Sequence, residues 1–81
     1  MNVPDFIHFL IKQGGAHQVT RFAYNGAGLV EYVGIAPRGS ATSAAVWFIY
    51  RMTYSGNNVT VIETTPNDDQ VYDDRASATY A

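Results

Sequence analysis

Alternating apolar residues mark two pairs of strands in the middle of the chain. Val19–Tyr24 and Trp47–Tyr54 are rich in β-branched and aromatic residues, which favour a pleated sheet. Each is followed by a short turn of Gly, Asn or Ser residues and then by a second β-prone stretch, Leu29–Ile35 or Val59–Thr64. The pattern therefore predicts two successive β-hairpins.

The two predicted hairpins share a weak sequence repeat. The segment Arg21-Phe-Ala-Tyr24-Asn-Gly26 returns later in the chain as Arg51-Met-Thr-Tyr54-Ser-Gly56. Two units are too few for a solenoid, which normally needs three or more repeats. The repeat therefore favours a pair of hairpins within one domain.

Both faces of the predicted strand Trp47–Tyr54 are largely apolar. One face carries Phe48, Tyr50, Met52 and Tyr54, and the other carries Trp47, Ile49, Arg51 and Thr53. A strand that is apolar on both faces is normally covered on both sides. We predict a mainly β fold, a small antiparallel sandwich or barrel-like structure, in a single domain over residues 1–81.

The N-terminal part of the chain fits more than one structure. Pro4-Asp5 before Phe6–Lys12 and Gly14-Gly15 after it are typical of a short helix. The same residues also fit an extra strand, or an arm over residues 1–16 that lies on a neighbouring subunit. We favour the strand, because Ile and Phe suit a sheet.

The remaining segments are predicted as connections. Residues 37–45 are small and polar, which is typical of a loop between the hairpins. Pro66–Arg75 is polar and acidic, and Asp73 and Asp74 are placed to cap one helical turn. Residues 76–81 are expected to form a final short strand or a tail.

Composition indicates that the chain associates with other proteins. It has 81 residues, of which 47% are apolar, 14% aromatic and 15% charged, whereas an average soluble domain has about 25% charged residues. Interfaces are depleted in charge and enriched in aromatic residues, and a domain this small buries a modest fraction of its surface. We expect a homo-oligomer or docking onto a larger protein. The predicted contact residues are Trp47, Tyr50, Arg51, Tyr54 and Tyr72.

Several classes of function are disfavoured. The five basic residues are scattered singly in a chain of net charge −2, which argues against a nucleic-acid partner. The apolar run Phe6–Ile11 is far shorter than the roughly 20 residues of a membrane span. The sequence contains no glycine-rich phosphate loop and no dinucleotide-binding fingerprint, so we expect no cofactor. The chain is therefore expected to be soluble and made in the cytoplasm.

Candidate catalytic and metal-binding residues are few. His17 with Ser40 or Ser43 has no spacing that supports a hydrolase, so we expect no enzymatic activity. There is no Cys, and two His residues are too few for a metal cluster. The acidic residues over 67–75 lack the spacing of a calcium-binding EF-hand loop, and we favour a solvated turn over a cation site.

Three motifs in order resemble small structural proteins of tailed bacteriophages. Residues 32–47 contain a Pro-x-Gly-x-Ala-Thr-Ser-Ala-Ala-x-Trp loop and strand, residues 53–60 a Thr-Tyr-x-Gly-Asn-Asn-Val-Thr hairpin, and residues 71–77 a Tyr-Asp-Asp-Arg-Ala-Ser segment. The similarity covers roughly residues 22–80. Ser55 stands where those proteins usually have Asp, and Tyr72 where they usually have Trp.

The resemblance implies a structural component of a tailed-phage virion, made in the cytoplasm of the bacterial host. Its partners would be copies of itself and a major capsid, neck or tail protein. Capsid decoration, neck, tail and fibre attachment all remain open. A different class, an independent glycan- or ligand-binding module that uses the same tyrosines as a platform, is the alternative.

Overall fold

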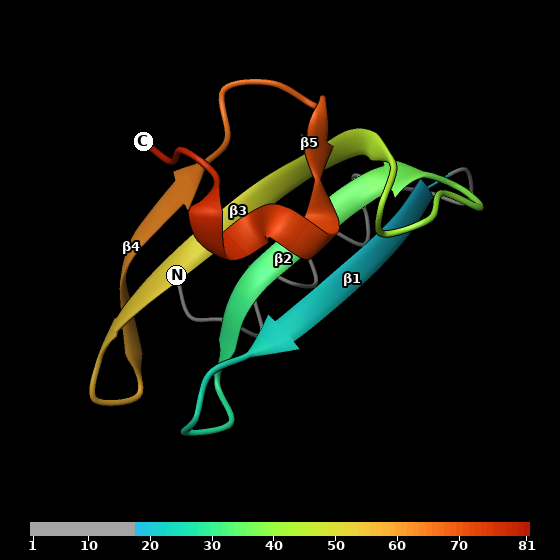
Figure 1. The fold of residues 1–81 in the computed structure, drawn as a ribbon. Helices are drawn as coiled ribbons and strands as arrows, with labels where there is room; N and C mark the ends of the chain where they lie inside the picture. The colour runs from blue at the N-terminus through green and yellow to red at the C-terminus, as the bar shows by residue number, and fades with distance from the viewer. Residues whose placement is uncertain (1–17) are drawn as a thin grey trace.

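The computed structural model describes residues 18–81, and the predicted N-terminal helix, strand or arm lies outside them. The described part contains two long hairpins, a short fifth strand and a 3₁₀ helix (Figure 1). The elements are β1 (Gln18–Tyr24), β2 (Val30–Pro37), β3 (Ala45–Ser55), β4 (Asn58–Thr64), β5 (Gln70–Val71) and η1 (Tyr72–Ser77). Both predicted hairpins are confirmed.

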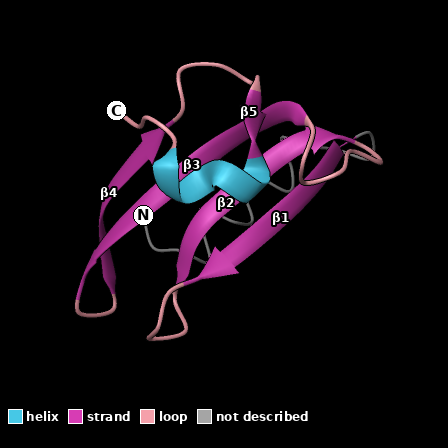
Figure 2. Cartoon of the chain, in the orientation of Figure 1, coloured by secondary structure: helices cyan, strands magenta, loops and turns pink. Residues whose placement is uncertain are grey.

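The four long strands form one antiparallel sheet in the order β1-β2-β3-β4. β5 pairs with the first residues of β3, and η1 crosses one face of the sheet (Figure 2). The mainly β, antiparallel fold class is thus confirmed. Within residues 18–81 the sheet stays open, so β1 and β4 are its edge strands.

The sequence repeat corresponds to a structural repeat at the ends of the two hairpins. The strand register shifts between Ala23 and Tyr24 in the first hairpin and between Thr53 and Tyr54 in the second. At each shift one residue of the returning strand, Glu31 in β2 or Thr60 in β4, has no partner in the register. This is the geometry of a β-bulge, which increases the local twist. The tyrosine of each copy therefore lies at the point where its strand leaves regular pairing.

Each face of the sheet has its own apolar core. On the face that η1 covers, called the η1 face below, four residues are buried: Ala36, Trp47, Ile49 and Tyr72. On the second face, Val30, Val33 and Met52 are buried among half-buried apolar side chains that include Phe22, Tyr50 and Ile62. The alternation of apolar residues along β3 therefore places part of that strand in both cores.

Gly34 in β2 gives η1 its close approach to the sheet. A Cβ atom at this position would lie 2.6 Å from Cε1 of Tyr72 and 2.9 Å from Cε3 of Trp47. Such distances are well below van der Waals contact, so only glycine leaves room for the Tyr72 ring against the backbone of β2. The missing side chain thus fixes where the C-terminal segment packs.

The C-terminal segment differs from its prediction in two respects. Asp73 and Asp74 lie inside the first turn of η1, and the residue before the helix, Val71, makes no side-chain capping hydrogen bond. The helix continues to Ser77, so residues 76–77 are helical. Beyond it, the chain returns to the sheet, where the N–H groups and carbonyl oxygens of Ala81 and Thr64 form two hydrogen bonds of 3.1 and 3.2 Å.

Candidate functional site

Two of the five predicted contact residues belong to the core of the η1 face. Trp47 is 0% exposed and Tyr72 is 5% exposed, and their ring centroids are 5.1 Å apart. The indole Nε1–H of Trp47 donates a hydrogen bond of 2.9 Å to the carbonyl oxygen of Ala41. These two side chains have no surface to offer a partner, so an interface role for them does not fit the structure. The Trp47 ring of β3 and the Tyr72 ring of η1 pack on each other instead.

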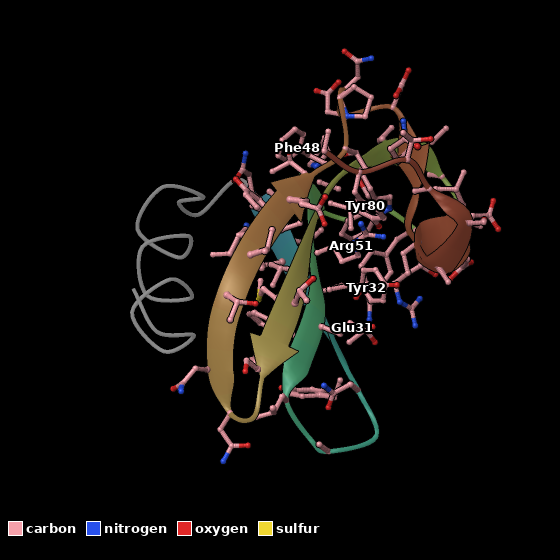
Figure 3. The ribbon with its side chains drawn as sticks, turned by 90° about the vertical axis from the view of Figure 1, so that its left-hand side faces the viewer. Glu31, Tyr32, Phe48, Arg51 and Tyr80 are labelled. Carbon is pink, nitrogen blue, oxygen red and sulfur yellow. The ribbon has the colours of Figure 1, made fainter. Side chains whose placement is uncertain are left out.

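Arg51 lies on the η1 face in a cluster of arginine and tyrosine side chains. Its Nη2 is 2.8 Å from Oε1 of Glu63 on β4, and its guanidinium is 4.5 Å from the centre of the Tyr80 ring. Figure 3 shows Arg51, Tyr80 and Tyr32 on the side of the sheet where η1 lies. The hydrogen bond from Arg51 to Glu63 raises the pKa of Arg51. Arg51 is therefore anchored within the chain, and its predicted intersubunit contact stays a prediction.

The same cluster continues through Arg75 in η1. Its guanidinium is 4.8 Å from the Tyr72 ring centre and 5.9 Å from the Tyr32 ring centre, and Tyr32 and Tyr80 are 6.0 Å apart. The hydroxyl of Tyr80 donates a hydrogen bond of 2.7 Å to the carbonyl oxygen of Arg75. Contacts of a cation with an aromatic face contribute about 0.5–2 kcal/mol each, depending on solvent exposure. This cluster thus holds the C-terminal segment on the sheet.

Tyr50 and Tyr54 lie on the second face. Tyr50 packs edge-on against Phe48 with ring centroids 5.2 Å apart, and burial raises its pKa. The hydroxyl of Tyr54 donates a hydrogen bond to the carbonyl oxygen of Val30, which joins the ends of the two hairpins. Both side chains are half-buried. The structure therefore separates the five predicted residues onto opposite faces.

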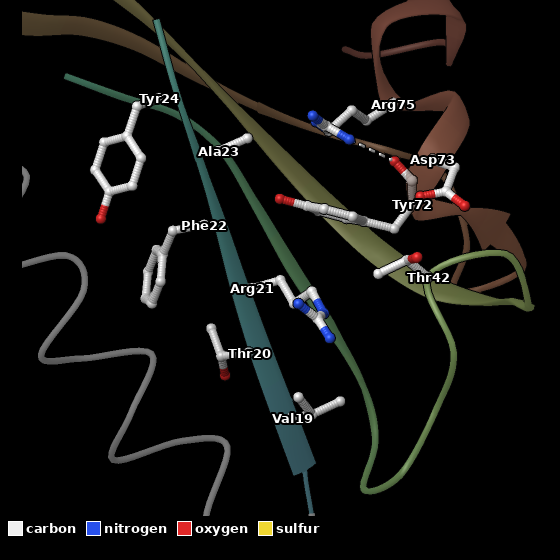
Figure 4. A pocket seen from close by; sticks show the side chains of 10 residues that line it. All are labelled: Val19, Thr20, Arg21, Phe22, Ala23, Tyr24, Thr42, Tyr72, Asp73 and Arg75. Atoms are coloured by element: carbon white, nitrogen blue, oxygen red, sulfur yellow. Dashed lines mark hydrogen bonds between the residues drawn. The ribbon is translucent and has the colours of Figure 1, made fainter. Parts of the chain in front are cut away.

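A groove of about 870 Å³ runs along β1, an edge strand of the sheet within residues 18–81 (Figure 4). Its floor is the length of β1 from Val19 to Tyr24, and its far side is formed by the loop before β3 and by η1. The charged side chains in the lining are Arg21, Asp73 and Arg75. Two of the three are cationic, which favours an anionic or hydrogen-bond-accepting group in this groove.

The Tyr72 hydroxyl is the unusual atom of this groove. It is buried and finds no hydrogen-bond partner within residues 18–81. An unpaired buried polar group costs about 1–3 kcal/mol. Burial raises the pKa of Tyr72, and the charges of Arg75 and Arg21 act in the opposite direction. In Figure 4 the hydroxyl points toward β1.

The predicted acidic turn and the candidate serines have ordinary structural roles. Asn67, Asp68 and Asp69 are exposed, and no group of three possible metal ligands occurs in the part of the chain that the structure describes. Ser40 Oγ–H donates a hydrogen bond of 2.6 Å to the carbonyl oxygen of Pro37, within the turn after β2. His17, its imagined catalytic partner, lies outside the described residues.

Sequence reasoning missed Gly34, Tyr80 and Arg75, which place η1 on the sheet. A glycine inside a strand is a signal of close backbone approach, and Gly34 carried that signal within the predicted strand Leu29–Ile35. Tyr80 and Arg75 lie in a segment without strand or helix periodicity. Their packing depends on contacts with residues far away in the sequence, which local patterns do not report.

No family model, no curated protein and no solved structure matches the chain. Within residues 18–81, none of the helical segments has the length and apolar character needed to cross a bilayer.

Proposed function

We propose that the chain is a non-catalytic structural component of a tailed-bacteriophage virion, a capsid decoration subunit or a part of the neck or tail. It would assemble with copies of itself or with a coat or tail protein after synthesis in the cytoplasm of the bacterial host. The three sequence motifs, which occur in the same order along the chain as in tailed-phage structural proteins, support this proposal.

The observation that carries the assembly part of the proposal is the open sheet. β1 and β4 each have one hydrogen-bonded neighbour strand within residues 18–81. Edge strands present unpaired N–H and C=O groups, which readily pair with another chain. Because Trp47 and Tyr72 are buried inside the chain, we assign the contacts to these edges rather than to the two aromatic side chains.

Mass spectrometry of purified phage particles tests this proposal directly. We expect the chain to co-purify with particles through a density gradient, and its copy number to give its position. Hundreds of copies would indicate capsid decoration, whereas about a dozen or fewer would indicate the neck or tail. Absence of the chain from particles of a phage that encodes it would refute the proposal.

The groove along β1 favours one second candidate, a binding module for a glycan or a small anionic ligand. Its cationic side chains Arg21 and Arg75 are suitable donors for such a ligand. A glycan array, together with a titration of acidic monosaccharides followed by calorimetry, separates the two candidates. Saturable binding that Arg75→Ala abolishes would favour the binding module.

A further inference from the structure

The two edge strands lack two of the features that normally prevent edge pairing. Natural edge strands often carry Lys or Pro residues, whereas β1 and β4 contain neither. Their regular pairing is interrupted only near the hairpin turns, where the register shifts. Two of the exposed large apolar side chains lie on these strands, Tyr24 on β1 at 63% and Val61 on β4 at 46%. Within residues 18–81, the β1 edge and the part of the β4 edge before Thr64 are therefore open to another strand.

The direction of the outer backbone groups follows from the hydrogen bonds of Thr64. Its N–H and C=O bind Ala81, so they point away from β3. In an antiparallel sheet, a residue that points away from one neighbour strand points toward the other. Tyr50 pairs with Thr64, so the N–H and C=O of Tyr50 point away from β4 and toward Val33 of β2. The N–H and C=O of Val33 point back toward Tyr50 and away from β1. Phe22 pairs with Val33, so the N–H and C=O of Phe22 point outward from the β1 edge.

The same alternation leaves Ile62 as the outward-pointing residue next to Thr64 on the β4 edge. The bonds between Thr64 and Ala81 show that this outer side of β4 accepts backbone partners. The edge on the turn side of Thr64 has no partner within residues 18–81. A neighbouring strand that pairs with Ile62 and continues past Glu63 therefore takes the place of Ala81 at Thr64.

Charge distinguishes the two edges. Arg21 is the one charged residue of β1, and Glu63 is the one charged residue of β4. Both side chains project to the η1 face, because Arg21 pairs with Gly34 and Glu63 pairs with Arg51. Within residues 18–81 the one ion pair joins Arg51 to Glu63, so Arg21 has no carboxylate partner there.

We propose that copies of this chain associate head to tail, with β1 of one copy paired to β4 of the next. In a sheet of four antiparallel strands β1 and β4 run in opposite directions, so this contact continues the sheet as an antiparallel pair and keeps η1 on the same side. When Phe22 lies opposite Ile62, Arg21 lies opposite Glu63, and Thr20 replaces Ala81 opposite Thr64. The contact specifies the self-association within the proposed structural role.

The charges favour this head-to-tail contact over a symmetric one. Pairing β1 with β1 of a second copy brings two Arg21 side chains together, and pairing β4 with β4 does the same for Glu63. Like charges across a strand pair are destabilising, and opposite charges are stabilising. A head-to-tail contact leaves one free edge at each end, so it builds a ring or an open filament.

Charge-reversal variants of the whole chain test the contact. We expect sedimentation velocity of the wild-type chain to show a mass that rises above 8.9 kDa with concentration. Arg21→Glu and Glu63→Lys should each raise the concentration of half-assembly about tenfold, which corresponds to about 1.4 kcal/mol. An equimolar mixture of the two variants should assemble, because each supplies the edge that the other lacks.

Matched controls carry the same charge changes away from the edges. Arg38→Glu lies in the exposed loop after β2, and Glu31→Lys lies on the interior strand β2. Both should assemble like the wild-type chain, and far-UV circular dichroism should show the wild-type fold for all four variants. The mixture guards against misfolding, since an unfolded variant is not restored by adding another.

Three outcomes would overturn the head-to-tail contact. A wild-type chain that stays at 8.9 kDa at every concentration would do so, as would a mixture no more assembled than its components. Assembly of Glu63→Lys alone at wild-type concentrations would show a contact that does not use β4. These outcomes are distinguishable from those of particle mass spectrometry. A chain that is monomeric in solution but present in particles would refute the head-to-tail contact and leave the virion role standing. A chain that assembles in solution but is absent from particles would refute the virion role.

Discussion

Replacing Gly34 with alanine should destabilise the protein by an amount that depends on Tyr72. The added methyl would lie 2.6 Å from Cε1 of Tyr72 and 2.9 Å from Cε3 of Trp47. Neither atom is the end of a flexible chain, and both rings are buried against each other. At a strand position with free space, the same substitution would be stabilising by roughly 0.5–1 kcal/mol. The sign of the effect therefore reports the close approach of the ring.

The expected magnitude is about 3 kcal/mol. Overpacking a core costs roughly 1–3 kcal/mol, and a ring displaced into solvent loses about 1.5–3 kcal/mol of burial on the scale for large apolar side chains. A domain of 81 residues is stable by about 4–12 kcal/mol in total. For a domain of this size each kcal/mol shifts the melting temperature by roughly 4–8 °C. Gly34→Ala should therefore lower Tm by at least about 10 °C.

Thermal unfolding followed by far-UV circular dichroism measures this effect. Gly26→Ala is the matched control, because its Cβ would meet no atom within 4 Å, and its Tm should stay close to that of the wild-type protein. A double-mutant cycle with Tyr72→Leu isolates the contact with the Tyr72 ring, since the smaller side chain relieves that clash and leaves only the approach to Trp47. A Gly34→Ala protein that melts with the wild type, or that is equally destabilised in the Tyr72→Leu background, would refute this account of η1 packing.

Two further predictions concern buried polar atoms. Thr65→Val should lower the free energy of unfolding by about 1–3 kcal/mol, because the Thr65 hydroxyl accepts a hydrogen bond from the Ile49 N–H, which the valine leaves unpaired. A urea titration measures this loss, with Thr79→Val as the control. A Thr65→Val midpoint equal to that of the control would contradict the prediction. Burial raises the pKa of Tyr80 from 10.0 to about 12, so the unfolded chain loses this proton first and stability should fall as pH rises across that interval. Tyr80→Phe should be less stable at neutral pH, where it lacks the bond to Arg75, but its stability should fall less between those pH values; equal losses in both proteins would argue against Tyr80 as a cause.

The hairpins were predictable because their signals are local. Alternating apolar residues and turns rich in Gly and Asn define Val19–Tyr24 and Trp47–Tyr54 without knowledge of any distant contact. The repeat of an Arg, a Tyr and a Gly at the same spacing also marks the positions of the two β-bulges, at Tyr24 and Tyr54. Local chemistry therefore determines this part of the fold.

The contact residues were less predictable because composition does not say which aromatic residues are buried in the core of the fold and which lie at its surface. The abundance of rings suggested an interface, but Trp47 and Tyr72 fill the core of the η1 face. The space for them comes from Gly34, on a different strand, and from a tail that packs through arginine–tyrosine contacts. The combination depends on residues far apart in sequence, so no single stretch of the chain reveals it.

The return of the C-terminal segment to the sheet has a consequence for biosynthesis. Tyr72, Tyr80 and Ala81 follow all four long strands in the chain, and they complete the packing of the η1 face and a backbone contact of β4. During translation both hairpins leave the ribosome while that face still exposes Trp47 and Ile49 to water. The nascent sheet is therefore prone to aggregation until residues 72–81 emerge and pack on it. The time that this packing takes sets how long a neighbouring nascent chain can bind the exposed face.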